Sequence, residues 1–317
     1  MPSHPSLDIP KEPTMNAELT TLRLAGAAQG FNWLPVYVAD EQGFFAEVGL
    51  KIEYIRLGSV DKTTAAVLDG SVDLAITPPE GAVANYIAGG PLRIIASNSE
   101  RLPMSVVARP GIPDLGALRG KRIGTSSLTE GTAIYIKIML AQAGLHYPGD
   151  FGFVLAGVHT ARWAALQNDE VDAAPQPAPW SFLAEREGYG LIGEVADAIP
   201  EIIFAAIVGS APWLVENRDV VRRLLAVIAR AHAFVNDPAN DAVTLPVYER
   251  ITTPEAPDLA ARGLAYTRDL GMWPVGARVS VAALAATADV MVQTGLMPDR
   301  QRAAAAGVVD ASFLEGA

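Results

Sequence analysis

One stretch, residues 65–80, constrains the fold more than any other part of the chain. It reads AAVLDGSVDLAITPPE: a helix end, a glycine, a short apolar run and a Thr-Pro-Pro-Glu turn. A glycine directly after a helix suits the left-handed conformation that ends many helices. A short apolar run predicts a buried strand of a parallel sheet. The turn would then lie at the carboxyl end of that strand, where open α/β sheets bind ligands.

The same phrase recurs once, at residues 164–179, which read AALQNDEVDAAPQPAP. A constant offset of 99 residues pairs Ala65 with Ala164, Ala66 with Ala165, Val72 with Val171, Asp73 with Asp172 and Ala75 with Ala174. Two interpretations stay open: a chance echo, or two lobes of like construction that each present a strand-end loop to a shared cleft. The second interpretation predicts a two-domain α/β binding protein.

Composition excludes several classes of partner and of chemistry. The chain has 317 residues, a hydrophobic content of 50% and a net charge of −11 without a block of like charges. This acidity argues against nucleic acid, which requires a basic face. No apolar run reaches the roughly 18 residues that span a bilayer, so membrane insertion is not expected. Because the chain has no cysteine, thiol nucleophiles and Cys-ligated zinc are excluded.

Residues 1–20 predict an N-terminal tail that is disordered or loosely docked. They are rich in proline and lack the basic start and apolar core of a signal peptide. If the chain is complete, this predicts a cytoplasmic protein. If a signal has been removed, it predicts a periplasmic one.

Strands and helices alternate along the chain in a pattern that leaves one lobe and later returns to it. The Pro/Gly cluster at residues 109–113 predicts the first crossing, and the apolar strand near residues 202–207 predicts the return. We therefore expect a discontinuous first lobe of residues 21–110 and 206–317 and a second lobe of residues 111–205.

Several phrases together carry a family resemblance: ADEQGFF at residues 39–45, GKRIG at 120–124, AGL at 143–145, VDA at 171–173 and VDASFL at 309–314. With the repeated phrase, they resemble the type II periplasmic binding proteins, specifically those for aliphatic sulfonates, taurine and thiamine precursors. The resemblance covers residues 22–314 and implies an α/β fold of two lobes with a ligand cleft between them. The same fold includes cytoplasmic enzymes: a sulfinate desulfinase, a pyrimidine synthase and dihydroxyphthalate-type decarboxylases. This chain lacks the cysteines of the first two.

Hydroxyl residues before a predicted helix are candidate anion ligands. Ser126, Ser127 and Thr132 precede this helix, and free N–H groups at a helix start attract carboxylate or sulfonate. Ordinary helix capping is the alternative, and the charge of Glu130 opposes anion binding. No Gly-rich phosphate loop and no metal spacing of histidines is present, so neither cofactor nor metal is expected.

Aromatic residues on the predicted cleft loops indicate a ring-containing ligand. These are Phe31, Trp33, Trp163 and Trp180, and core packing is the alternative for each. The remaining candidate contacts from the same loops are Asn32, Ser59, Thr77, Pro78 and Asn98.

Three charged or titratable residues complete the candidate site: Glu80, His159 and Arg162. Arg162 would hold an anionic group. If the protein is an enzyme, His159 and Glu80 are the candidate acid and base, one from each lobe. The alternatives are a surface histidine that caps a helix and a first-turn acid that stabilises one.

Two functions stay open. The first is a solute-binding protein that closes by hinge motion on a small organic ligand, anionic or aromatic, and serves an ABC permease if exported. The second is a cytoplasmic enzyme on the same fold that converts a small aromatic or heterocyclic acid by acid–base chemistry without a thiol. Fold alone does not decide between them.

Overall fold

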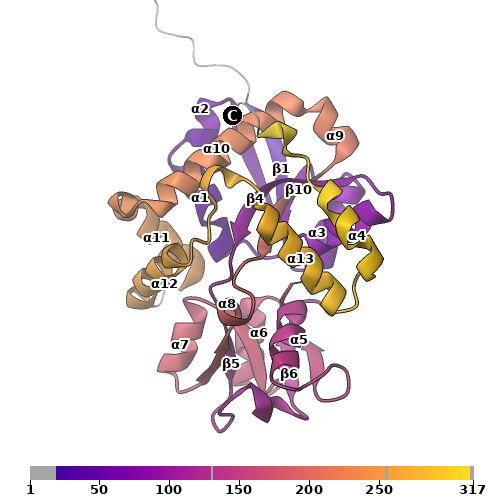
Figure 1. The fold of residues 1–317 in the computed structure, drawn as a ribbon. Coiled ribbons are helices and arrows are strands. Elements are labelled where there is room, and N and C mark those ends of the chain that lie inside the picture. Colours follow the sequence, from indigo (N-terminus) through magenta and orange to yellow (C-terminus); the bar gives the residue numbers. More distant parts are fainter. Residues whose placement is uncertain (1–18, 130, 254–255, 315–317) are drawn as a thin grey trace, which may run out of the picture.

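Two five-stranded sheets, one above the other in Figure 1, form the frame of the molecule. The computed structural model describes residues 19–129, 131–253 and 256–314, so residues 1–18 of the predicted tail lie outside it. The chain passes from the first sheet to the second after β4 and returns between β9 and β10. This α/β architecture of two lobes is the predicted fold class.

The two sheets have the same strand arrangement. The first has the order β2-β1-β3-β10-β4 and consists of β1 (Thr20–Gly26), β2 (Leu50–Arg56), β3 (Leu74–Thr77), β4 (Leu92–Glu100) and β10 (Ile203–Ser210). The second has the order β7-β6-β8-β5-β9 and consists of β5 (Met104–Ala108), β6 (Arg122–Thr125), β7 (Gly152–Leu155), β8 (Ala173–Pro177) and β9 (Gly190–Glu194). In each sheet the fourth strand, β10 or β5, is antiparallel to both neighbours. The repeated phrase therefore contributes β3 to one sheet and β8 to the other.

The same Arg–Asp contact ties each repeated phrase to its sheet. Asp73 accepts hydrogen bonds from the backbone N of Arg23 at 2.7 Å and from its guanidinium at 2.6 Å. Asp172 accepts from the backbone N of Arg122 at 2.8 Å and from its Nε at 3.3 Å. The two arginines are also 99 residues apart, so the sequence echo reflects one structural unit built twice.

Helices cover both faces of each sheet (Figure 1). The first lobe contains α1 (Leu34–Glu41), α2 (Phe44–Glu47), α3 (Val60–Leu68), α4 (Glu80–Ile87), α9 (Ala211–Glu216), α10 (Arg218–Asn236), α11 (Asp241–Thr252), α12 (Pro257–Asp269) and α13 (Val281–Gln293), with 3₁₀ helices η1 (Phe31–Trp33), η3 (Pro238–Asn240), η4 (Val275–Ala277), η5 (Asp299–Val308) and η6 (Ala311–Phe313). The second lobe contains α5 (Thr132–Gln142), α6 (His159–Gln167), α7 (Trp180–Arg186), α8 (Val195–Ala198) and η2 (Leu115–Leu118). No helix in these described ranges is long and apolar enough to cross a membrane.

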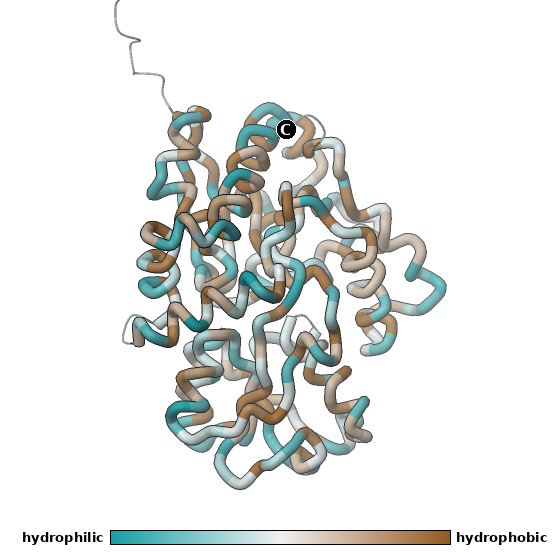
Figure 2. The backbone as a smooth tube through the Cα atoms, turned by 60° about the vertical axis from the view of Figure 1, so that its left-hand side comes forward, coloured by the Kyte–Doolittle hydropathy of each residue, from teal (hydrophilic) through white to brown (hydrophobic). Residues whose placement is uncertain are grey.

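Apolar side chains form a core on each face of each sheet. In the first lobe, α1 and α10 cover one face and α3, α4 and α13 the other. In the second lobe, α5 and α6 lie on opposite faces. Figure 2 shows hydrophobic segments inside both lobes and hydrophilic residues in many outer turns. These cores hold the strand ends, and hence the cleft loops, in fixed positions.

Sheet membership differs from the predicted lobe boundaries at two strands. Met104–Ala108 is β5 and pairs with β8 and β9, so the first crossing precedes this strand instead of following it at residues 109–113. Ile203–Ser210 is β10 of the first sheet, so the return is complete three residues before position 206. Both strands run antiparallel to their neighbours, a pairing that apolar periodicity does not reveal.

The C-terminal helices of the first lobe also contact the second lobe. Leu259 of α12 packs in one apolar cluster with Phe182 and Leu183 of α7. The Tyr266 hydroxyl donates to Glu194 at 3.2 Å, and Arg262 pairs with Glu185 at 3.0 Å. The lobes are therefore in contact beside the cleft as well as through the two crossings.

Candidate ligand site

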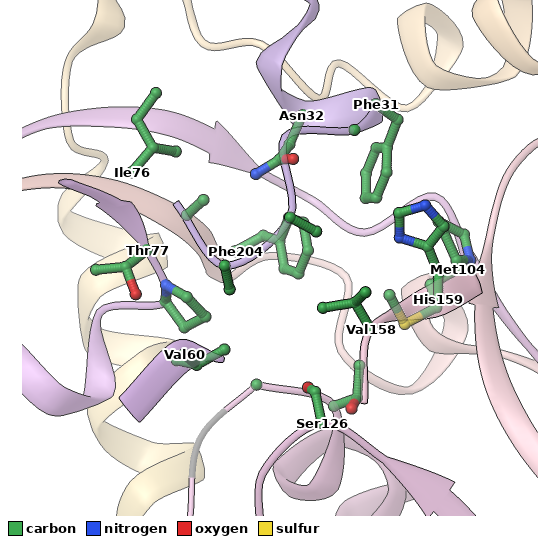
Figure 3. A pocket seen from close by; sticks show the side chains of 18 of the residues that line it. Phe31, Asn32, Val60, Ile76, Thr77, Met104, Ser126, Val158, His159 and Phe204 are labelled. Atoms are coloured by element: carbon green, nitrogen blue, oxygen red, sulfur yellow. The ribbon is translucent and has the colours of Figure 1, made fainter. Parts of the chain in front are cut away.

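A cavity of about 90 Å³ lies between the lobes. A water molecule needs about 10–15 Å³ on this measure, so the cavity admits several waters or a small ligand group. In Figure 3, Phe31 and Asn32 approach from above, Val60 and Thr77 from the left, and Ser126 from below. The lining residues of the first lobe are Ala27, Ala28, Gly30, Phe31, Asn32, Val60, Ile76, Thr77, Pro78, Phe204 and Ala205, and those of the second are Met104, Ser126, Gly131, Thr132, Val158, His159, Arg162 and Pro177.

Arg162 is the cationic group of this cavity. Its side chain is 3% exposed, and it donates from Nε to the Pro175 carbonyl at 2.9 Å and from Nη1 to the Gly157 carbonyl at 3.0 Å. Among the described residues, no carboxylate forms an ion pair with it. Burial lowers the pKa of Arg162 to about 9. An uncompensated buried charge is costly, so the site favours an anion beside this guanidinium.

The start of α5 lies on the same cavity. Ser126, Gly131 and Thr132 line it, and Gly131 has a φ of +61°, a conformation that favours glycine. The Thr132 hydroxyl lies 3.0 Å from that of Thr125. The first N–H groups of an α-helix lack partners within the helix and favour an anion. Glu130, which would oppose an anion, lies outside the described residues.

Ser127 lies at the lobe interface, not in the cavity lining. Its hydroxyl is 3.5 Å from the Asp61 carboxylate of α3, and it accepts a hydrogen bond from the Thr129 N–H at 3.2 Å. Ser127 thus contacts the other lobe, and its anion contact stays a prediction.

Two aromatic rings from the first lobe form a wall of the cavity. Phe31 and Phe204 are stacked, with ring centroids 5.7 Å apart and an interplanar angle of 15° (Figure 3). Trp33, by contrast, is 0% exposed and packs in the first-lobe core, and Trp163 packs edge-on against Tyr189. The core-packing alternative thus describes both of these tryptophans.

His159 begins α6 and lies between the cavity and Trp180. Its ring centroid is 5.6 Å from that of Trp180. Burial, together with the positive charges of Arg162 and Arg56, lowers the pKa of His159 to about 3. The imidazole is therefore neutral at pH 7 and offers one donor and one acceptor.

Three other predicted contacts do not line this cavity. Glu80 is 2% exposed at the start of α4, and its charge acts with burial to raise the pKa of Tyr135 in α5. Asn98 lies inside β4, and its Nδ2 donates to the Asn32 carbonyl at 2.8 Å. Ser59 caps α3. The structure thus does not bring Glu80 and His159 together on the cavity wall.

Sequence reasoning missed several lining residues because they lie within strands or at helix starts, outside the candidate contacts chosen from the predicted cleft loops. Phe204 belongs to β10 and Met104 begins β5, both next to the lobe crossings. Val60 begins α3, and Val158 directly precedes α6. For Phe204 and Met104, the position next to a lobe crossing was the sequence signal that could have identified them as lining residues. Within the described parts of the chain, no group of three or more His, Asp or Glu residues is placed to hold a metal ion.

The comparisons with known proteins agree with this architecture. The alkanesulfonate-binding protein SsuA of Xanthomonas axonopodis pv. citri is 19% identical with a TM-score of 0.72, and the match covers 93% of this chain and 99% of that one. The nitrate-binding protein NrtA of Synechocystis is 14% identical with a TM-score of 0.73, over 94% of this chain and 88% of the other. At these low sequence identities, both comparisons show a similar fold only.

A curated relative matches over part of its length. A Brucella abortus protein, named only as a binding protein, is 26% identical over 200 residues, which are 62% of this chain and 61% of that protein. The chain thus spans about three fifths of the length of this relative. The family model described as NMT1/THI5 like matches residues 30–241. This segment includes every strand of the two sheets except β1, and all residues that line the cavity except Ala27 and Ala28. The chain belongs to the NMT1/THI5-like family.

Proposed function

We propose that this protein binds a small organic anion that carries a ring, between its two lobes. The observation that carries the proposal is Arg162, a buried cation on the cavity wall with no ion-pair partner among the described carboxylates. A ligand carboxylate or sulfonate would supply the missing charge, and the helix start at Thr132 would add N–H donors. The stacked Phe31 and Phe204 would contact its ring.

Lobe closure follows from this placement of groups. The guanidinium and helix start belong to the second lobe, whereas the aromatic wall belongs to the first. A ligand in contact with both would stabilise the closed arrangement over an open one, which is the basis of hinge motion in two-lobed binders.

An acid–base enzyme has less support from the geometry. Glu80 does not line the cavity, and a His159 pKa of about 3 makes its protonated form scarce at pH 7. General acid–base catalysis works best with a pKa near the working pH. The proposal therefore takes binding as the function of the site.

Relatives suggest the setting of this binding. The names of the structural relatives include periplasmic and ABC-import ligand-binding proteins. By this likeness, the protein would act outside the cytoplasmic membrane and deliver its ligand to an ABC permease. Fractionation of cells that produce the full-length protein would test the location: recovery only with cytoplasmic markers would contradict it.

A thermal-shift panel tests the binding proposal. Benzoate and benzenesulfonate should raise the unfolding midpoint of the wild type, whereas glucose and spermidine should not, because only a ligand of the native state raises it. Arg162→Met should abolish the shift, and Arg300→Met, which removes an exposed charge that does not line the cavity, should keep it. Stabilisation by spermidine or glucose alone would overturn the proposal.

A further inference from the structure

A second cavity adjoins the first. Its volume is about 100 Å³, and it shares Ala28, Gly30 and His159 with the lining of the first cavity. Both lobes contribute to it: Arg56 from the end of β2 and Trp180 from the start of α7 lie on its wall. The two spaces therefore adjoin at Ala28, Gly30 and His159.

The wall of this second cavity is rich in hydrogen-bond donors. Gln29 Nε2 and Trp180 Nε1 are buried without an acceptor. Arg56 adds a positive charge, and it forms no ion pair with a described carboxylate. No Asp or Glu of the described chain lines either cavity. The two buried donors are costly without an acceptor, so this wall favours a group that accepts hydrogen bonds. Arg56, which is an exposed residue, adds an attraction for negative charge.

We infer that the ligand is a dianion that extends past His159 and places its second acidic group against Arg56, Gln29 and Trp180. This inference rests on the proposed function, because it assigns the first acidic group to Arg162. A neutral imidazole at position 159 separates the two cationic ends and can hydrogen-bond the ligand without adding charge. A methyl group at Gly30 would lie 3.0 Å from His159 Cε1, so a side chain at this position would crowd the boundary between the two cavities.

The test compares dianions with monoanions of matched size by calorimetry. The pairs are succinate with butyrate, adipate with hexanoate, and terephthalate with benzoate. In the wild type, at least one dianion should bind about 10-fold more tightly than its partner, the effect of one added hydrogen-bonded charge. Arg56→Met should reduce this advantage below about 3-fold and leave monoanion affinity within about 2-fold. Trp180→Phe, which keeps the ring beside His159 but removes the N–H, should reduce it by about 3-fold.

Arg300→Met serves as the charge-matched control and should preserve the advantage. Monoanions that bind as tightly as dianions in the wild type would overturn this inference and leave the proposed function intact. A dianion advantage that survives both Arg56→Met and Trp180→Phe would also overturn it. Failure of all six probes to bind the wild type would reject the proposed function and this inference together.

Discussion

The two lobes share a scaffold but differ in the chemistry that they present to the cleft. Positions 99 residues apart are equivalent: Pro78 and Pro177 both line the cavity, and α3 and α6 begin at equivalent residues. At these helix starts, however, the first lobe has Val60 where the second has His159.

About one turn further along each helix, the equivalent residues differ in charge: Thr63 in α3 is neutral, and Arg162 in α6 is cationic. Thr63 of α3 donates its hydroxyl to the Ser59 carbonyl of its own helix, whereas Arg162 of α6 lines the cavity. The repeated scaffold thus fixes where side chains lie, and a few substitutions decide what they bind. The second lobe would hold the anionic group, and the first would supply the apolar wall.

Removal of the second-lobe cation should have the largest effect. Arg162→Met should weaken binding of the tightest probe anion by about 30-fold or more, because loss of a buried charged partner costs about 2–5 kcal/mol. Thr63→Val, at the equivalent first-lobe position, should change affinity by less than about 2-fold, since Thr63 contacts its own helix. Calorimetry on both variants measures this asymmetry, and equal losses would contradict it.

Acid should destabilise both lobes through two histidines, the buried His232 and the half-buried His159. Burial lowers the pKa of His232 in the first lobe to about 4, and that of His159 in the second to about 3. Below about pH 6.5 the unfolded chain takes up protons that the folded protein does not, so stability falls with pH between 6.5 and these values.

The contribution of each histidine to this loss can be separated by substitution. Between pH 7.5 and 5, His232→Asn and His159→Asn should each lose about 2 kcal/mol less stability than the wild type. Glu100 and Glu194, whose pKa values are raised chiefly by burial, act in the opposite direction in all three proteins. Urea denaturation at both pH values measures the difference. If a variant has the same pH dependence of stability as the wild type, the histidine that it lacks does not contribute to the acid destabilisation.

The repeated Arg–Asp contact should stabilise both lobes equally. Asp73→Asn and Asp172→Asn should each lower the free energy of unfolding by about 1.5 kcal/mol, because each carboxylate accepts charged hydrogen bonds in a partly buried position. Asp219→Asn, which breaks an exposed ion pair within α10, should cost less than about 0.5 kcal/mol. A large cost in only one lobe would mean that the two contacts are not equivalent.

The aromatic wall should have the smallest effect, confined to ring-containing ligands. Phe204→Leu keeps an apolar side chain but removes the partner of Phe31. Affinity for benzoate should fall by about 5-fold, in line with the 0.5–1.5 kcal/mol of an aromatic pair, while affinity for butyrate should stay within about 2-fold. Equal losses for both ligands would indicate a general change of cavity shape.

Much of the scaffold was predictable because it depends on local patterns. Strand and helix order, the glycine stops and the family phrases lie within short windows of sequence. The echo between Asp73 and Asp172 also marked equivalent strands in two lobes, as the sheets confirm. The placement of β5 and β10 was not predictable in this way, because an antiparallel pairing depends on which distant strand lies alongside.

Only the tertiary structure decided which strand-end residues reach the cavity. The sequence placed Phe31, Trp33, Glu80 and Arg162 on loops or helix starts at the correct edge of the sheets, and it determined the two-lobed fold. Phe31 and Arg162 line the cavity, whereas Trp33 packs into the core and Glu80 lies away from the lining. The physical reason is that a side chain's direction depends on the helices and strands packed against its own segment, and these contacts join residues far apart in the sequence.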